Sequence, residues 1–371
     1  MAWLTATYLI DAAPDEIEAR ASALAIEQSV ECPLAAIGDQ RVLHEIVGRV
    51  AGIEPAGDGR YRVDVGLAVE TTGGEPAQLM NMIFGNCSLW EHVRFVDVTL
   101  PEPLLARFPG PRHGIAGIRA LLDAPQRAMT STAVKPQGLP VAELARLCKT
   151  FALGGVDIVK DDHGIANQTY SPFDERVRAC QRAVLEAVET TGKPAFYAPS
   201  LSGTPRVLRE RARLARDLGV RVVLVAPMLI GLPAFADLVD EFPEFVYLAH
   251  PSAAGGRIDP VLIFGKLFRL FGADAVIFTN YGGRFAYPRE SCAALAAAAR
   301  APWGTLAPAL PVPAGGMLLE RVDELLEFYG DDTMMLIGGN LLIARDALLE
   351  RTREYVAKVE GHGRTHVALH A

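Results

Sequence analysis

The residues best placed to do chemistry are Lys160, Asp161, Asp162 and His163, which directly follow the apolar run 154–159. That run is rich in β-branched residues and too short for a helix, so it predicts a buried parallel strand. The four polar residues then stand at the carboxyl end of that strand, where α/β barrels hold their active sites. The alternative is a solvated turn, or a Lys–Asp ion pair that only stabilises the barrel mouth.

Three of these residues are candidates for a metal site. A free lysine is not a metal ligand, but Lys160 carbamylated by CO2 would be a carboxylate. With Asp162 it would give two hard oxygen ligands for Mg²⁺. His163 would be a softer third ligand, or would act as a general acid or base instead.

Two further strand ends carry a basic side chain before a proline. Lys135 precedes Pro136, and a partly desolvated lysine can remove a proton next to a carbonyl. Phosphate binding or plain surface charge is the alternative for Lys135. His250 follows the apolar run 246–249, where it is either catalytic or a buried structural histidine.

Glycine-containing loops complete the candidate site. Arg284 follows Gly282 and Gly283. This segment is either a mobile loop that closes the positively charged Arg284 over a substrate, or an exposed turn. Two glycine pairs follow the last two predicted strands, at the place where barrels bind phosphate through backbone N–H groups. They are Gly315-Gly316 and Gly338-Gly339.

The pattern that must position these residues begins at about residue 112. Eight runs predict strands: 131–135, 156–160, 194–199, 221–225, 245–249, 275–279, 303–309 and 333–337. Helices are predicted at 141–153, 172–191, 205–218, 233–241, 260–271, 288–300, 318–329 and 341–359. Eight β/α units predict a TIM (β/α)8 barrel over residues 112–371. A doubly wound sheet is the alternative, but no GxGxxG follows the first strand.

Residues 1–108 predict a separate small α+β domain, with prolines between 101 and 111 as the linker. Strands are expected at 3–10, 45–56 and 60–68, and a helix at 15–28. The net charge of −8 argues against a nucleic-acid binder, and five scattered cysteines without a CxxC pair suggest neither a zinc site nor a disulfide framework. With neither a signal peptide nor a membrane span apparent, we expect a cytoplasmic protein.

Together these residues resemble the large subunit of ribulose-bisphosphate carboxylase, RuBisCO. The resemblance covers most of the chain and includes the Lys-Pro pair at 135–136, the segment GGxDxxKDD at 154–162 and the glycine pairs near 315 and 338. It implies a small ferredoxin-like α+β domain before the barrel, and Mg²⁺ bound with a carbamylated Lys160. It also implies that Asn86 and Glu27 bind substrate in the barrel of a partner subunit, and therefore a homodimer.

The sequence also departs from the family pattern. His163 stands where the family has a Glu as third metal ligand, and Arg284 stands where it has the mobile-loop Lys that holds CO2. Other substitutions remove substrate contacts: Gln137 replaces a Lys, Pro251 an Arg, Ile277 a His and Ala314 a Ser. The resemblance therefore implies a non-carboxylating RuBisCO-like protein of form IV.

Such a protein keeps the enolisation chemistry, in which a metal and Lys135 stabilise an enediolate. We expect an isomerase or enolase of a phosphorylated ketose with a single phosphate, such as 5-methylthioribulose 1-phosphate from methylthioadenosine salvage. Ile277, Phe278 and Ala314 would suit an apolar substrate end, or would only pack the core.

Three alternatives stay open. Arg284 motivates a decarboxylase of a phosphorylated 3-oxo sugar acid, such as 3-oxo-isoapionate 4-phosphate, because guanidinium binds carboxylate in a bidentate manner. His163 motivates a non-catalytic metabolite sensor. An unrelated barrel aldolase would use Lys135 or Lys160 as a Schiff base.

Overall fold

The structure is a computed structural model that describes residues 2–285 and 287–370, with side chains of the last helix described as far as residue 362. The chain divides into two compact units. One unit comprises the residues up to 109 together with 254–263, and the other comprises 110–253 and the residues from 264 onward.

The first unit is built on a four-stranded antiparallel sheet in the order β2-β3-β1-β4. Its elements are β1 (Trp3–Asp11), α1 (Ile17–Glu27), β2 (Arg49–Gly57), β3 (Arg60–Ala68), α2 (Pro76–Phe84), β4 (Val93–Thr99) and α3 (Glu102–Leu105). Buried Tyr8 ties the sheet to α2 by donating a hydrogen bond of 2.6 Å to the carbonyl oxygen of Ile83. The strand predicted from residue 45 begins only at Arg49, because Val42–Ile46 form a π-helical turn.

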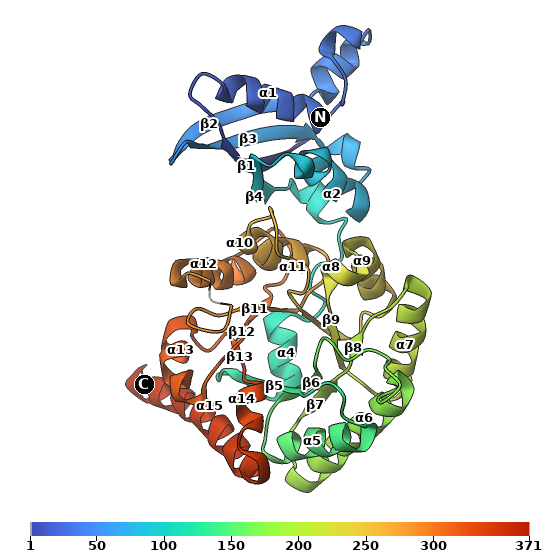
Figure 1. Cartoon of the computed structure of the whole chain (residues 1–371), viewed down its shortest axis with the longest axis vertical. Coiled ribbons are helices and arrows are strands. Elements are labelled where there is room, and N and C mark those ends of the chain that lie inside the picture. Colours follow the sequence, from blue (N-terminus) through green and yellow to red (C-terminus); the bar gives the residue numbers. More distant parts are fainter. Residues whose placement is uncertain (1, 286, 371) are drawn as a thin grey trace. The chain divides into compact units, whose positions relative to one another are not determined.

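The second unit confirms the predicted TIM barrel. Parallel pairing joins β13-β5-β6-β7 in one sheet and β12-β11-β10-β9-β8 in the other (Figure 1). The strands are β5 (Met129–Val134), β6 (Ile158–Asp161), β7 (Phe196–Ala198), β8 (Ser200–Leu201), β9 (Val222–Val225), β10 (Val246–Ala249), β11 (Ala275–Thr279), β12 (Leu310–Ala314) and β13 (Met334–Leu336). Only Pro199 separates β7 from β8, so these two are one barrel strand, and its carbonyl accepts a hydrogen bond from Leu224 N of β9.

The prediction of the seventh barrel strand at 303–309 is wrong. That segment is mostly irregular, and the strand is β12, which contains Pro311 and Pro313. Leu310 N donates a hydrogen bond of 2.8 Å to Asp274 O, on the side of β11. The backbone nitrogens of residues 311 and 313, which alternate with it, are therefore on the side of β13. Because proline has no N–H, these positions donate nothing to β13, and the seam between β12 and β13 has no regular ladder.

Helices lie around the strands and at one end of the barrel (Figure 1). They are α4 (Gly114–Leu122), α5 (Val141–Leu153), α6 (Phe173–Thr191), α7 (Pro205–Asp217), α8 (Pro227–Ile230), α9 (Leu232–Glu241), α12 (Arg289–Arg300), α13 (Val322–Tyr329), α14 (Gly339–Leu342) and α15 (Leu348–His370). The helix predicted at 260–271 is divided into α10 (Pro260–Leu262), a π-helical turn and α11 (Phe268–Leu270).

Helix α4, which the sequence pattern did not predict, closes the amino-terminal end of the barrel. Its residues Ile115, Ile118 and Leu122 join the apolar core of the barrel interior. Buried Asp274, just before β11, holds the start of α4 by accepting hydrogen bonds from the backbone N–H groups of His113 and Gly114. The opposite, carboxyl end of the strands is thereby left for polar side chains.

A buried ion pair fixes the carboxyl end of β6. Asp161 and Arg176 have fully buried side chains, and Arg176 Nε lies 3.1 Å from Asp161 Oδ2. Asp161 also accepts hydrogen bonds from the Tyr197 hydroxyl (2.7 Å) and from Ser200 N (3.0 Å). The remaining guanidinium nitrogens of Arg176 donate to carbonyl oxygens at 166 and 171, which holds the loop after β6.

Within the described part of the chain, no helix is long and apolar enough to cross a membrane.

Replacing Arg176 with Ala should strongly destabilise the barrel, because Asp161 would remain buried without its charged partner. We expect the free energy of unfolding to fall by about 3–5 kcal/mol in urea titrations followed by circular dichroism. The control is Arg206→Ala, which breaks an exposed pair with Glu210 and should cost less than about 1 kcal/mol. Equal stability of the two variants would contradict the assigned role of Arg176.

Candidate active site

Five polar side chains stand at the carboxyl ends of three barrel strands. Lys135 follows β5, Lys160, Asp162 and His163 lie at and beyond the end of β6, and His250 follows β10. The charges of the first four residues all act on the His250 ring, so the five side chains form one electrostatic cluster.

Asp162 is the centre of this cluster. Its Oδ1 atom lies 2.6 Å from Lys135 Nζ and 3.2 Å from His163 Nδ1. Burial alone would raise the pKa of this carboxyl group, but the hydrogen bonds from His163 and Lys135 outweigh it and hold the pKa well below its usual range. Asp162 is therefore a carboxylate, and the ion pair at the barrel mouth joins it to Lys135.

Lys160 is buried between small neighbours. In the strand register it lies opposite Ala133 on β5 and Ala198 on β7, and side chains in register share one face of the sheet. Its side chain is 3% exposed, and Nζ donates a hydrogen bond of 3.0 Å to Asp161 O. Burial, together with the charge of Lys135, lowers the pKa of Lys160 to about 8. At a given pH near 8, a far larger fraction of Lys160 is therefore in the neutral amine form than of an exposed lysine.

The two histidines lie face to face. The rings of His163 and His250 stack with centroids 3.9 Å apart and an interplanar angle of 18°. Burial, helped by the charge of Lys160, lowers the pKa of His250 far below its usual value, so this ring is neutral. Ser252 contacts the Nδ1 atom of His250 with both its hydroxyl and its backbone N–H.

The unmodified side chains do not make a metal site by themselves. Among the described residues, no three His, Cys, Asp or Glu side chains are grouped to hold a metal ion. Asp161, the other carboxylate of the motif, is engaged by Arg176, Tyr197 and Ser200. A carbamate on Lys160 would add the missing oxygen donors beside Asp162 and His163, so the cluster fits a divalent cation in that form.

The loops after β11 and β12 pack backbone against backbone. Arg284 N donates a hydrogen bond of 3.1 Å to Gly315 O, and a Cβ atom on Gly283 would lie only 2.0 Å from that oxygen. Gly315 and Gly316 both have φ of +88°, a conformation that favours glycine. The Arg284 side chain is exposed, and its guanidinium lies 4.6 Å from the centre of the Phe285 ring.

The second glycine pair lies beside Lys135. A Cβ atom on Gly338 would lie 3.8 Å from Lys135 Cε, which brings the loop after β13 against this side chain. Gly339 begins α14, and Asn340 Nδ2 joins this loop to the preceding one by donating 2.7 Å to Met317 O. Both pairs of glycines therefore stand on adjacent, connected loops.

Two predicted substrate-binding residues belong to the first unit. Asn86 Nδ2 donates a hydrogen bond of 2.9 Å to Glu27 Oε1, although the two residues are 59 positions apart in the chain. Cys87 N and Gln28 Oε1 form the neighbouring, buried link at 3.0 Å. Glu27 and Asn86 therefore form one polar pair.

The positions that depart from the family pattern have different surroundings. Ile277 lies in the barrel interior, and Ala314 ends β12. Phe278 points outward instead, with its ring edge-on to that of Tyr329 at 6.0 Å, so it is not available to an apolar substrate end. Gln137 packs against Gly164, where an added Cβ atom would lie 1.7 Å from its Nε2.

Sequence reasoning missed two residues that shape the site. Arg176 lies on α6, far from the motif in the chain, and no local pattern marks it as the partner of Asp161. Ser252 was also missed, although a hydroxyl two residues after a strand-end histidine, across a proline, is a usable signal.

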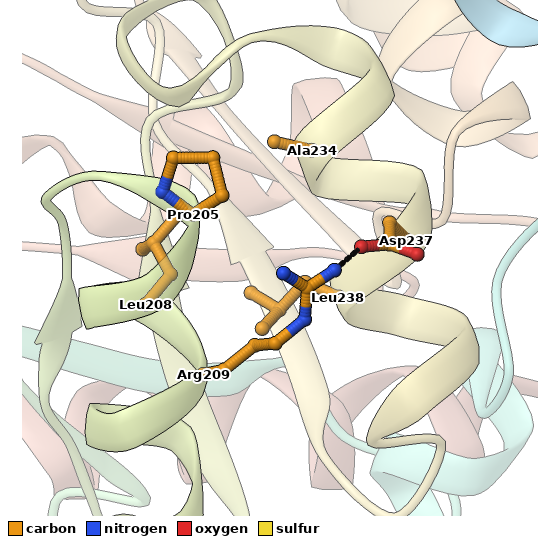
Figure 2. A pocket seen from close by; sticks show the side chains of 6 residues that line it. All are labelled: Pro205, Leu208, Arg209, Ala234, Asp237 and Leu238. Atoms are coloured by element: carbon orange, nitrogen blue, oxygen red, sulfur yellow. Dashed lines mark hydrogen bonds and ion pairs between the residues drawn. The ribbon is translucent and has the colours of Figure 1, made fainter.

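Two pockets are lined by none of the five residues of the polar cluster. One, between α7 and α9, is lined by Pro205, Leu208, Arg209, Ala234, Asp237 and Leu238 (Figure 2). Its volume is about 10 Å³, no more than one water molecule needs, and the Arg209–Asp237 ion pair spans it. The other, of about 280 Å³, lies between the segment 318–320 and α14.

Comparison with known proteins agrees with this geometry. Residues 114–343 match the model of the ribulose bisphosphate carboxylase large chain, catalytic domain. Ribulose bisphosphate carboxylase-like protein 1 of Rhodopseudomonas palustris is 53% identical over 96% of this chain and 97% of its own length. The 5-methylthioribulose-1-phosphate isomerase of Rhodospirillum rubrum is 51% identical over 96% of each chain.

A solved structure shows the same fold. The crystal structure of a Rubisco-like protein from Rhodopseudomonas palustris superposes with a TM-score of 0.92 at 49% identity, over 98% of this chain and 99% of that one. Sequence, fold and the polar strand ends therefore lead to one conclusion: the chain belongs to the ribulose bisphosphate carboxylase large-chain family and is one of its RuBisCO-like proteins.

Proposed function

We propose that this protein is an isomerase that moves a proton between carbon atoms of a phosphorylated ketose, with 5-methylthioribulose 1-phosphate as substrate. The observation that carries the proposal is the cluster of Lys135, Lys160, Asp162, His163 and His250 at one end of the barrel. The relative from Rhodospirillum rubrum, 51% identical over nearly the whole chain, is named for that activity.

Lys160 prepares the site in this proposal. Its neutral amine reacts with CO2, and the small side chains of Ala133 and Ala198 leave room beside it on the neighbouring strands. The carbamate, Asp162 and His163 would then hold Mg²⁺, which polarises a substrate carbonyl group. An imidazole nitrogen of His163 is a softer ligand than the carboxylate oxygens that Mg²⁺ prefers, so we expect weaker Mg²⁺ binding than three carboxylates would give.

Lys135 has two roles that depend on its partner. While it is paired with Asp162 at 2.6 Å, it presents an ammonium group that stabilises negative charge on an enediolate. Were Asp162 to hold a cation, Lys135 would be released from that carboxylate and would be the group that accepts the proton from the substrate carbon. Return of the proton to the neighbouring carbon, together with transfer of the hydroxyl proton to the former carbonyl oxygen, completes the isomerisation.

The phosphate would be held by backbone N–H groups of the two connected loops, at Gly315, Gly316, Gly338 and Gly339. The proposal also includes a homodimer in which the polar pair of Glu27 and Asn86 completes the site of the partner subunit. The support for the dimer is the family resemblance, together with the preformed geometry of this pair.

A second candidate activity is decarboxylation of a phosphorylated 3-oxo sugar acid. Arg284 favours it, because its guanidinium is exposed and has no ion pair among the described residues. A substrate carboxylate would supply that pair. Stoichiometric CO2 release from such an acid, lost in Arg284→Ala, would support this activity over the isomerase.

Replacing Lys160 with Ala should abolish isomerisation of 5-methylthioribulose 1-phosphate, because both the carbamate and the metal site are lost. We expect a loss of about 10³-fold or more in kcat, assayed by NMR of the product with Mg²⁺ and bicarbonate present. The matched control, Lys149→Ala, removes an exposed lysine of α5 paired with Glu186 and should keep full activity. Near-normal activity of Lys160→Ala would exclude the proposal.

Carbamylation of Lys160 should depend on pH in a defined direction. Only the neutral amine reacts with CO2, and the lowered pKa of about 8 makes that form abundant at or above pH 8. Between pH 8 and pH 6 the neutral fraction falls about 50-fold, so the initial rate of carbamate formation at fixed dissolved CO2 should fall equally. ¹³C NMR with ¹³CO2 measures this rate, and a rate independent of pH would contradict the assignment to Lys160.

A further inference from the structure

The turn that follows β10 folds back onto its own histidine. His250 N donates a hydrogen bond of 2.7 Å to Val225 O, which holds the residue at the strand end. The chain then passes through Pro251, and Ser252 approaches the His250 ring. Ser252 Oγ lies 2.9 Å and Ser252 N lies 3.2 Å from His250 Nδ1.

These two contacts decide which ring nitrogen carries the proton. A backbone N–H can only donate, so Nδ1 must accept and cannot itself be protonated. The Ser252 hydroxyl, which can donate or accept, then donates to the same nitrogen. With Nδ1 unprotonated, the ring carries its proton on Nε2, the nitrogen that Ser252 does not contact.

The rest of the His250 ring faces the polar cluster. The His163 ring covers one face at a centroid distance of 3.9 Å. The charged groups that act on the ring are those of Lys160, His163, Asp162 and Lys135, from the ends of β5 and β6. The Nε2–H group is consequently the hydrogen-bond donor that His250 can offer to a ligand in the cluster.

We infer that Ser252 is a positioning residue that holds His250 as a neutral Nε2–H donor toward an oxygen atom of the substrate. This inference rests on the proposed isomerase function. The donated hydrogen bond stabilises the charge that develops on that oxygen while the proton of the adjacent carbon passes to Lys135. Ser252 thereby makes His250 a hydrogen-bond donor to the substrate oxygen, so that another residue acts as the base.

The test combines histidine ¹⁵N NMR with isomerase kinetics, because a purely structural serine would not change a tautomer. In the wild-type enzyme at alkaline pH, the His250 signals should show Nδ1 unprotonated and Nε2 protonated. His113 provides an internal reference of the same tautomer, since its Nε2 lies 3.1 Å from Pro243 O, which can only accept.

Replacing Ser252 with Ala removes the hydroxyl and leaves only the longer backbone contact. We expect the ratio of the Nδ1–H to the Nε2–H tautomer to rise about 5-fold, and kcat for 5-methylthioribulose 1-phosphate to fall in proportion to the Nε2–H fraction that is lost. KM should stay within about twofold, because substrate binding does not require this tautomer. Ser252→Thr keeps the hydroxyl and should restore both the NMR signature and kcat.

An Nδ1–H tautomer in the wild type would overturn the inference, as would a Ser252→Ala variant with unchanged tautomer and unchanged kcat. A wild-type enzyme that shows the Nε2–H tautomer but no isomerase activity would overturn the proposed function alone. The assignment of the His250 tautomer to Ser252 would then still be decided by the spectra of the two variants.

Discussion

The buried ion pair between Asp161 and Arg176 is the interaction on which the rest of the site depends. It lies on the outer side of β6, where Tyr197 and the backbone of Ser200 also bind Asp161. Side chains alternate along a strand, so an anchored Asp161 turns both of its neighbours, Lys160 and Asp162, toward the barrel mouth. One carboxylate is thus used for structure, and a lysine and a second carboxylate are left at the barrel mouth.

In the polar cluster, two basic side chains share the carboxylate of Asp162. Asp162 Oδ1 contacts both Lys135 and His163. Lys160 is buried nearby and, among the described residues, has no ion pair with a carboxylate. This arrangement leaves Lys160 with a lowered pKa. A change of partner at Asp162 would alter the electrostatic surroundings of both lysines together.

Much of this arrangement can be predicted from the sequence, because a parallel barrel places all strand ends at one edge. The pattern at 154–163 was sufficient to place Lys160 and Asp162 at such an end. The seventh barrel strand was predicted at the wrong place because Pro311 and Pro313 are unusual in a strand, and β12 tolerates them only at the barrel seam. Helix α4 was not predicted because its apolar residues pack into the barrel interior, a contact that depends on the whole fold. The Lys135–Asp162 pair and the partner of Asp161 depend on contacts between strands and helices that no local pattern encodes.

In the proposed reaction, this cluster moves a proton between carbons of a sugar phosphate without breaking a carbon–carbon bond. Incubation with 5-methylthioribulose 1-phosphate, Mg²⁺ and bicarbonate in D2O tests it most directly, with NMR following both the products and the isotope. We expect an isomeric sugar phosphate with deuterium at the carbon next to the carbonyl group. Recovery of unchanged, unlabelled substrate from the wild-type enzyme would contradict it.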